Sequence, residues 1–164
     1  STLKEFPNFN ASIDVNSNKI TYKKYFHIGF AVDTPHGLMV PKIRNVDQMS
    51  IQKIGEELKK TSKLCRELKI NKKEFFGGSI TISSLGGIGG THFTPIINPP
   101  EVAILGVGKN FDRLVKENGK IVSRKILPVS LSYDHRIIDG AEGARFCVYL
   151  GKCLGKDFAF KLAV

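Results

Sequence analysis

The sequence predicts an α/β fold of the α+β sandwich type, in which helices cover a mixed sheet on one side. Several segments alternate apolar and polar residues, which is the period of a half-buried strand. Two other segments repeat apolar residues every three or four positions, as amphipathic helices do. The predicted order is strands, helix, two strands, hairpin, strand and helix. Because strands and helices do not alternate regularly, this order disfavours a sheet built from repeated strand-helix-strand units.

The chain is expected to form one domain, residues 1–164, that is truncated at its N-terminus. A length of 164 residues suffices for one domain with a real core and is short for two. The first residues resemble the last turn of a helix that Pro7 ends, and no capping signal precedes Leu3.

The next segment predicts strands joined by a turn. Residues 19–33 alternate apolar and polar side chains and indicate one long strand, or two. Residues 34–37 form a turn, and the chain returns through residues 38–44, where Pro41 favours an edge strand or a bulge. His36 lies in this turn and is expected to face solvent.

A helix is predicted from Ile51 to about Leu68. Ser50 is a suitable N-cap, and apolar residues recur along one face while the opposite face is charged. This pattern favours an amphipathic surface helix over a membrane or nucleic-acid element.

Residues 79–83 predict a strand, and a loop with four glycines between positions 86 and 90 follows it. No Lys-Ser or Lys-Thr pair follows and no helix begins there, so the loop lacks the pattern of a phosphate-binding loop. The glycines instead indicate close packing of the backbone. His92, which follows this loop, is a second candidate base.

The second half predicts four more strand segments. Residues 101–108 are mostly apolar and indicate a strand buried on both faces. The Asn-Gly pair at positions 118–119 predicts a hairpin that joins short strands near residues 114–115 and 121–122. Residues 126–133 alternate after a proline and predict the strand that precedes the second helix.

His135 is the candidate catalytic base. It follows this last strand and precedes a segment with helical spacing, for which Asp139 is a suitable N-cap. A corner between strand and helix fixes the backbone and leaves the edge of the ring open, as a general base near neutral pH requires. The alternative is a histidine without a chemical role that Asp134 or Asp139 holds in a loop.

The composition excludes several classes of protein. The chain is 41% hydrophobic and 24% charged, with no apolar run of membrane-spanning length and no secretory signal. Cys65, Cys147 and Cys153 lack disulfide or metal-binding spacing and are predicted to be small buried thiols, with a catalytic thiol as the less favoured alternative. We therefore expect a cytoplasmic protein with no metal and no membrane partner.

The net charge of +10, from 25 Lys and Arg against 15 Asp and Glu, indicates an anionic partner or a solvated basic surface. The basic residues are scattered and no nucleic-acid motif is present, so no nucleic-acid partner is expected. A phosphorylated cofactor such as coenzyme A would use the same charge with fewer contacts.

Nearly the whole chain resembles the catalytic domain of the dihydrolipoyl acyltransferases, the core subunits of 2-oxo acid dehydrogenase complexes. Residues 134–140, Asp-His-Arg-Ile-Ile-Asp-Gly, are similar to the His-x-x-x-Asp-Gly signature that this family shares with chloramphenicol acetyltransferase. Flanking segments match in family order, at residues 6–10, 28–34, 37–41, 81–86, 89–96, 100–106 and 143–146. The resemblance is closest to the acetyl-transferring branch of bacterial pyruvate dehydrogenase complexes, and it implies a chloramphenicol acetyltransferase-like fold.

The resemblance implies transfer of an acetyl group between the thiols of dihydrolipoamide and coenzyme A. His135 would remove the proton of the incoming thiol, because the thiolate is the nucleophile. The hydroxyl that matches Ser83 would donate to the tetrahedral oxyanion. Asp139 would hold the loop and the ring in place, through an arginine, without transferring a proton. No residue is assigned to coenzyme A.

The resemblance also implies an assembly. Homotrimers with His135 facing Ser83 of a neighbour would form a cubic core of roughly 24 subunits, or alternatively a shell of roughly 60. The apolar segment 158–164 suits the contact between trimers. The family's lipoyl domain, which carries the lipoyl group, and its subunit-binding domain are absent from this chain. Partners would be the decarboxylase and dihydrolipoyl dehydrogenase subunits of the complex, which acts after glycolysis.

Three alternatives stay open. A succinyl-transferring homologue is one, because residues 97–100 are closer to that branch, although Ser83 and residues 101–103 resemble the acetyl-transferring one. A shell-forming fragment that assembles without turning over is the second. A basic nucleic-acid-binding domain is the third and the least favoured.

Overall fold

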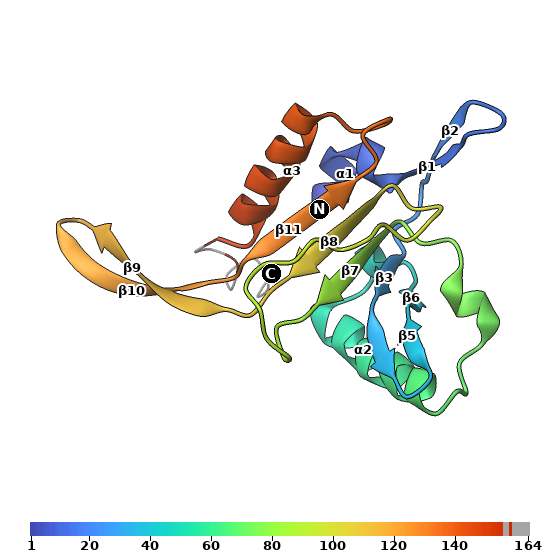
Figure 1. Cartoon of the computed structure of the whole chain (residues 1–164), viewed down its shortest axis with the longest axis horizontal. Helices are drawn as coiled ribbons and strands as arrows, with labels where there is room; N and C mark the ends of the chain where they lie inside the picture. Colours follow the sequence, from blue (N-terminus) through green and yellow to red (C-terminus); the bar gives the residue numbers. More distant parts are fainter. Residues whose placement is uncertain (156–157, 159–164) are drawn as a thin grey trace.

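A computed structural model describes residues 1–155 and 158 of the chain. A five-stranded sheet with the strand order β11-β8-β7-β3-β6 forms its centre (Figure 1). The strands β3, β7 and β8 run parallel to one another, and β11 and β6 run antiparallel to their neighbours. The segment 158–164, expected to join trimers, lies outside the described residues except for Phe158.

The elements follow the predicted order with additional short pieces. Their bounds are α1 Thr2–Glu5, η1 Pro7–Asn10, β1 Ala11–Asp14, β2 Lys19–Tyr22, β3 Ile28–Phe30, β4 Val32–Thr34, β5 Gly37–Met39, β6 Lys42–Ile43, η2 Val46–Gln48, α2 Ile51–Arg66, η3 Lys72–Phe75, β7 Ile80–Ser84, β8 Ala103–Val107, β9 Phe111–Glu117, β10 Lys120–Ile126, β11 Val129–Tyr133 and α3 Gly140–Cys153.

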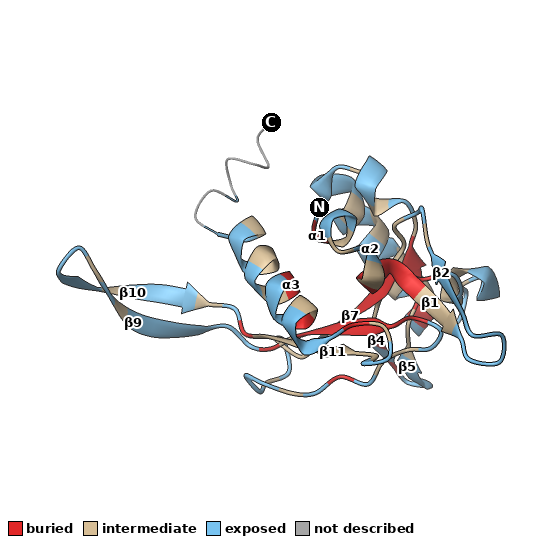
Figure 2. Ribbon diagram, turned by 90° about the horizontal axis from the view of Figure 1, so that it is seen from above, coloured by how far each residue is buried: buried red, intermediate tan, exposed pale blue. Residues whose placement is uncertain are grey.

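The helices cover one face of the sheet, as predicted, and leave the other face to loops (Figure 2). Ser50 caps α2, because its Oγ accepts from Lys53 N at 3.2 Å. Asp139 caps α3, because its Oδ1 accepts from Glu142 N at 2.7 Å. Both N-cap predictions are confirmed, and each cap satisfies a backbone donor that the helix leaves unpaired.

The core lies between the sheet and the N-terminal side of α3. Phe9 and Phe146 stack with ring centroids 4.1 Å apart, and both are buried together with Ile80, Val102 and Ile138. Because Ile138 immediately precedes the helix cap, the core anchors the corner that carries His135.

The prediction of a long strand over residues 19–33 is wrong. This segment contains β2, β3 and β4, which belong to three different sheets. The Nδ2 group of buried Asn10 donates to the carbonyls of Lys23 and Tyr25, at 3.0 and 2.9 Å, and these bonds hold the link between β2 and β3. An alternating pattern indicates extended backbone and does not specify the partner strand.

The two predicted turns, at residues 34–37 and 118–119, are confirmed, and the strands on either side of the second turn are longer than expected. β4 and β5 form the hairpin with exposed His36 in its turn. β9 and β10 pair around Asn118 and Gly119, whose φ angles of 49° and 80° suit a tight hairpin turn. Both strands are longer than predicted and form a separate ribbon that projects from the body (Figure 1). Leu114 and Ile121 on it are 72% and 74% exposed.

The cysteines are all free thiols, and Cys65 alone of the three is fully buried. Burial raises the pKa of the Cys65 and Cys147 thiols. A raised pKa disfavours the thiolate, so these two thiols are poor nucleophiles. Cys147 and Cys153 are half-buried, so the expectation of buried thiols is confirmed for Cys65 alone of the three.

Within the described residues, no helix has the length and apolarity needed to cross a membrane.

A buried ion pair joins the edge strand β6 to the entry of β8. Lys42 Nζ lies 2.5 Å from Glu101 Oε1, and each side chain is 1% exposed. Removing one member of such a pair leaves an uncompensated charge in the interior.

We predict that Lys42→Met lowers the free energy of unfolding by roughly 3–5 kcal/mol, as measured by urea titration. Lys125→Met is the matched control, because Lys125 pairs with Asp112 at 3.5 Å on the exposed ribbon, and its loss is expected to stay below about 1 kcal/mol. An equally small loss for Lys42→Met would contradict a structural role for the pair.

Candidate active site

His135 lies at the corner between β11 and α3, as predicted. Asp134 N donates to Val102 O at 2.8 Å, and the carbonyl of Asp134 accepts from Ile137 N and Ile138 N at 3.0 and 3.1 Å. This turn surrounds His135, while the residue itself is exposed in the single chain. The Tyr133 ring lies 5.9 Å from the His135 ring, centroid to centroid.

Asp134 is engaged by Arg136 across the histidine. Arg136 Nε lies 2.9 Å from Asp134 Oδ1, and Arg136 Nη2 lies 2.5 Å from Oδ2. The hydrogen bond from Arg136 lowers the pKa of Asp134, so this carboxylate stays ionised. Among the contacts of the described residues, no carboxylate binds the His135 ring. The alternative of a histidine held by Asp134 or Asp139 therefore finds no support in the single chain.

Asp139 acts on the loop as the N-cap of α3. The arginine contact expected for it is absent among the described residues, where Arg136 pairs with Asp134 instead. Tyr133 also restrains this corner, because its ring packs closely against Gly143 near the start of α3. A Cβ atom at Gly143 would lie only 2.8 Å from Tyr133 Cε1. The glycine thus lets α3 approach the ring of Tyr133.

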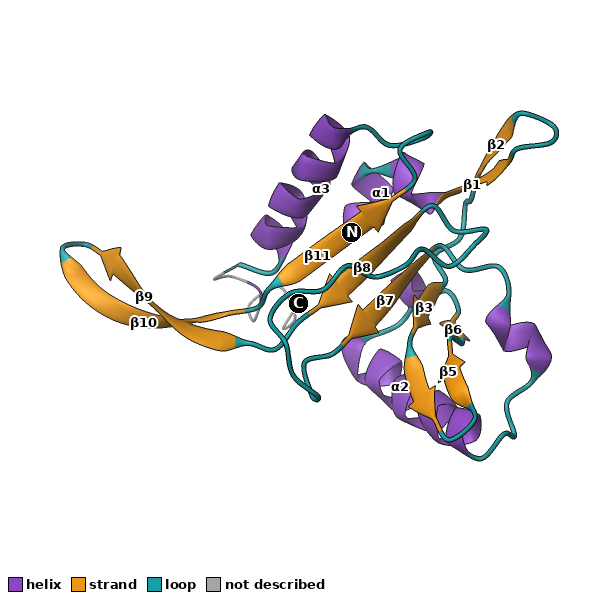
Figure 3. Ribbon diagram, in the orientation of Figure 1, coloured by secondary structure: helices purple, strands orange, loops and turns teal. Residues whose placement is uncertain are grey.

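Ser83 lies on β7, on the face of the sheet opposite the helices. Its neighbours Ile80 and Ile82 line a cavity of about 770 Å³ on the helical side, so Thr81 and Ser83 point the other way. Across the sheet, Ser83 is in register with Gly106, and Gly106 with Ser130. Ser130 Oγ donates to Phe93 O at 2.6 Å, which brings the β7–β8 loop across this face (Figure 3).

Ser83 and His135 lie at opposite ends of the sheet within one chain. β11 runs antiparallel to β8, which runs parallel to β7. β11 lies two strands from β7 in the sheet, which is a distance of roughly 10 Å. Ser130 is level with Ser83 across the sheet, and Tyr133 lies roughly 10 Å further along β11 than Ser130. His135 comes after Tyr133, so the two side chains of one chain cannot act on the same carbon atom.

The close backbone packing predicted for the glycine-rich loop, residues 86–90, is found at only one of its four glycines. A Cβ at Gly86 would lie 3.2 Å from Gly108 O, which is the close backbone packing expected. Nothing lies within 4 Å of such an atom at Gly87, Gly89 or Gly90, and the φ angles of 151° and 81° at the last two explain those glycines instead. His92 is exposed, and its Nδ1 lies 3.2 Å from Thr91 Oγ1.

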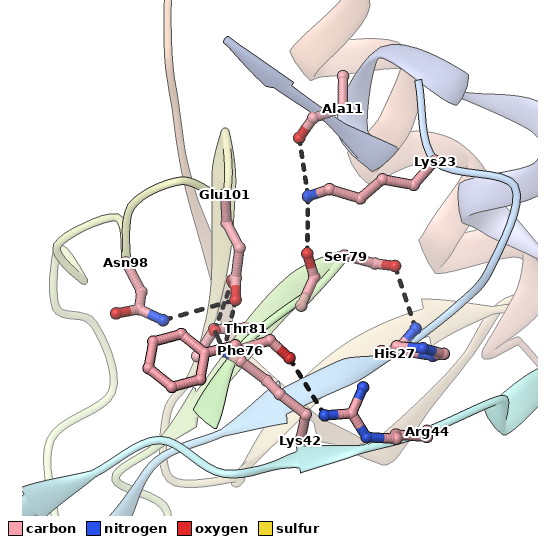
Figure 4. Close-up of polar contacts among 11 residues, drawn as sticks. Ala11, Lys23, His27, Lys42, Arg44, Phe76, Ser79, Thr81, Asn98 and Glu101 are labelled. Atoms are coloured by element: carbon pink, nitrogen blue, oxygen red, sulfur yellow. Dashed lines mark hydrogen bonds and ion pairs between the residues drawn. The ribbon is translucent and has the colours of Figure 1, made fainter. Parts of the chain in front are cut away.

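A buried polar cluster beside Ser83 was not predicted. Thr81 Oγ1 donates to Glu101 Oε2 at 2.5 Å, and Lys42 Nζ donates to Thr81 Oγ1 at 3.3 Å (Figure 4). Asn98 Nδ2 lies 3.5 Å from Glu101 Oε1. The sequence carries a weak signal for this cluster, because Lys42 and Glu101 are charged residues beside otherwise apolar strand segments.

The family model for the 2-oxoacid dehydrogenases acyltransferase catalytic domain matches residues 1–159. The chain belongs to this family. The acetyltransferase component of the pyruvate dehydrogenase complex from Cupriavidus necator is 52% identical over 156 residues, which is 95% of this chain and 28% of that protein. This chain therefore spans under a third of the length of that relative.

Solved structures agree with this assignment. The dihydrolipoamide acetyltransferase of Azotobacter vinelandii and the cubic core of a pyruvate dehydrogenase multienzyme complex each superpose with a TM-score of 0.92 at 49% identity. Each comparison covers 99% of this chain and 66% of the other. Chloramphenicol acetyltransferase superposes with a TM-score of 0.54 at 14% identity, over 88% of this chain and 68% of that one. The predicted fold is confirmed.

We predict that Asp139→Ala destabilises the chain by about 1 kcal/mol, because it removes the cap bond to Glu142 N. Asp139→Asn keeps an acceptor at the same position and is expected to change the stability by a few tenths of a kcal/mol. Urea titration measures both, and equal losses for the two variants would refute the cap as the source of the effect.

Proposed function

We propose that the chain transfers an acetyl group between S-acetyldihydrolipoamide and coenzyme A in the core of a pyruvate dehydrogenase complex. The observation that carries the proposal is a spacing. In the Azotobacter vinelandii enzyme, a serine, a histidine and an asparagine with investigated roles in the catalytic mechanism are separated by 52 and 4 residues. Ser83, His135 and Asp139 have the same two separations.

His135 serves as the general base in this proposal. A free thiol has a pKa of about 8.5, so a base must remove its proton near neutral pH. The exposed ring at the corner is open to an incoming thiol, while the turn around it holds the backbone. The thiolate attacks the thioester carbonyl and forms a tetrahedral intermediate. The bond from the carbonyl carbon to the original sulfur then breaks, and His135 returns its proton to the departing thiolate.

Ser83 stabilises the tetrahedral oxyanion by donating its hydroxyl hydrogen. Because His135 and Ser83 of one chain lie at opposite ends of the sheet, a second copy must supply one of them. A site between the copies of a homotrimer meets this requirement. Asp139 holds the loop by capping α3, and an asparagine in the Azotobacter vinelandii enzyme can accept the same bond.

The ribbon of β9 and β10 supports an assembly. A two-stranded hairpin is marginally stable alone in water, and this one exposes Leu114 and Ile121. Packing against a neighbouring copy would cover these side chains. The cubic core among the similar structures favours a cubic arrangement of trimers for this chain over the larger shell.

The remaining parts of the proposal rest on the relatives and on composition. The lipoyl group would be carried on a domain outside this chain, and the decarboxylase and dihydrolipoyl dehydrogenase would be its partners. Coenzyme A is a substrate whose phosphates suit the net charge of +10. Three free thiols favour the cytoplasm, where glycolysis supplies pyruvate. The acetyl-transferring relative favours the acetyl over the succinyl group.

We predict that His135→Ala lowers kcat for acetyl transfer from acetyl-CoA to dihydrolipoamide by roughly 10²–10⁴-fold, because the base is lost. Ser83→Ala is expected to lower it by roughly 10²–10³-fold, since an oxyanion donor is lost. His36→Ala, in the exposed β4–β5 turn, is the matched control and should retain full activity. Unchanged activity of His135→Ala would end the proposal, and binding of coenzyme A without any turnover would favour a structural fragment.

A shared site between copies predicts complementation. We expect co-assembly of equal amounts of Ser83→Ala and His135→Ala chains to restore part of the activity, although each variant alone is strongly impaired. In a cyclic trimer, about a quarter of the sites then combine an intact His135 with an intact Ser83 of the neighbour. The effect is measured by comparing the activity of the mixed assembly with the activities of the two variants assayed separately. No recovery of activity in a mixed assembly would argue against a site between copies.

A further inference from the structure

The buried cluster behind Ser83 joins three strands of the sheet. Lys42 belongs to the edge strand β6, Thr81 to the central strand β7, and Glu101 precedes β8. All three residues are at most 5% exposed. Glu101 uses both carboxylate oxygens, one for Lys42 at 2.5 Å and the other for Thr81 at 2.5 Å. Figure 4 shows these side chains converging between the strands.

Neighbouring glycines leave the space that this cluster occupies. A Cβ at Gly29 would lie 2.5 Å from Thr81 Oγ1 and 2.6 Å from Lys42 Nζ. A Cβ at Gly78 would lie 2.2 Å from Glu101 Oε1. The backbone of β3 and the segment before β7 therefore approach the polar groups directly, and any side chain there would displace them.

Stability alone gives no reason for this arrangement. Taking two charges out of water costs several kcal/mol for each ion, and apolar side chains of similar volume often give an equal or greater stability. The ion pair and its hydrogen bonds instead fix how the three residues are placed relative to one another, because a carboxylate with both oxygens bonded holds its partners in one geometry. Thr81 is the partner that belongs to the strand of the proposed oxyanion donor.

Thr81 and Ser83 are two residues apart on β7 and therefore point to the same face of the sheet. The bond to Glu101 fixes Thr81 at the buried end of the strand, whereas Ser83 lies toward the end that leads into the glycine-rich loop. A strand held on one side in this way has less freedom to shift or rotate.

We infer that Thr81, through Glu101 and Lys42, is a positioning residue for the Ser83 hydroxyl. This inference rests on the proposed function, because it assumes that Ser83 contacts the reacting carbonyl. Thr81 itself touches no substrate in this arrangement. It acts through β7, and its loss should slow the chemical step while substrate binding stays nearly the same.

The test measures kcat and KM for acetyl transfer after Thr81→Val, in the Ser83 background and in the Ser83→Ala background. Valine keeps the branched shape and lacks the hydroxyl. In the Ser83 background we expect kcat to fall by between about tenfold and a hundredfold, with KM within about twofold. In the Ser83→Ala background we expect no further fall, because the group that Thr81 positions is already gone. Thr81→Ser keeps the hydroxyl and should retain near-normal kcat.

Equal losses in both backgrounds would overturn the inference, since an effect that ignores Ser83 is a general structural one. Unchanged kcat for Thr81→Val would also overturn it and would leave the proposed function intact if Ser83→Ala is still impaired. If Ser83→Ala itself is fully active, the proposed role of Ser83 fails and the inference falls with it. Should Thr81→Val not fold, the pair Thr81→Ser and Thr81→Ala, which differ by the hydroxyl alone, gives the same comparison.

Discussion

The direction of β11 relative to β7 is the constraint on which the rest of the site depends. The central strands β3, β7 and β8 run parallel, and β11 returns antiparallel at the edge. A corner after β11 must therefore lie at the end of the sheet where β7 begins, far from Ser83. This geometry separates His135 from the Ser83 hydroxyl in each chain, so the proposed chemistry, which requires both groups, needs two copies of the chain.

Different contacts hold the two halves of the proposed site. His135 is held by local bonds, with the Asp134 carbonyl closing the turn and Asp139 starting the helix behind it. Ser83 is held by contacts between segments far apart in the chain, because its strand is tied through Thr81 to Glu101 and Lys42. Helices cover the opposite face of the sheet, which leaves the Ser83 face to the β7–β8 loop.

The positions of His135, Ser83 and the β9–β10 ribbon can be compared with what the proposed chemistry requires. The proposed thiol-transfer chemistry needs an open base and an oxyanion donor. His135 is exposed at one end of the sheet, and Ser83 is half-buried at the other end. The exposed ribbon of β9 and β10 adds apolar surface that a single copy leaves in water. These features agree with the proposal that the chain acts as an acyltransferase with a site formed between two copies.

The sequence by itself determined the local features: the caps at Ser50 and Asp139, the Asn-Gly hairpin, the corner at His135 and, through its motifs, the family. Each depends on residues within a few positions of one another, so that spacing and side-chain type suffice. Tertiary structure decided which strands pair, why residues 19–33 divide among three sheets, and how Lys42, Thr81 and Glu101 meet. Those contacts join residues 20 to 59 positions apart, and alternation along one strand carries no information about the partner across it.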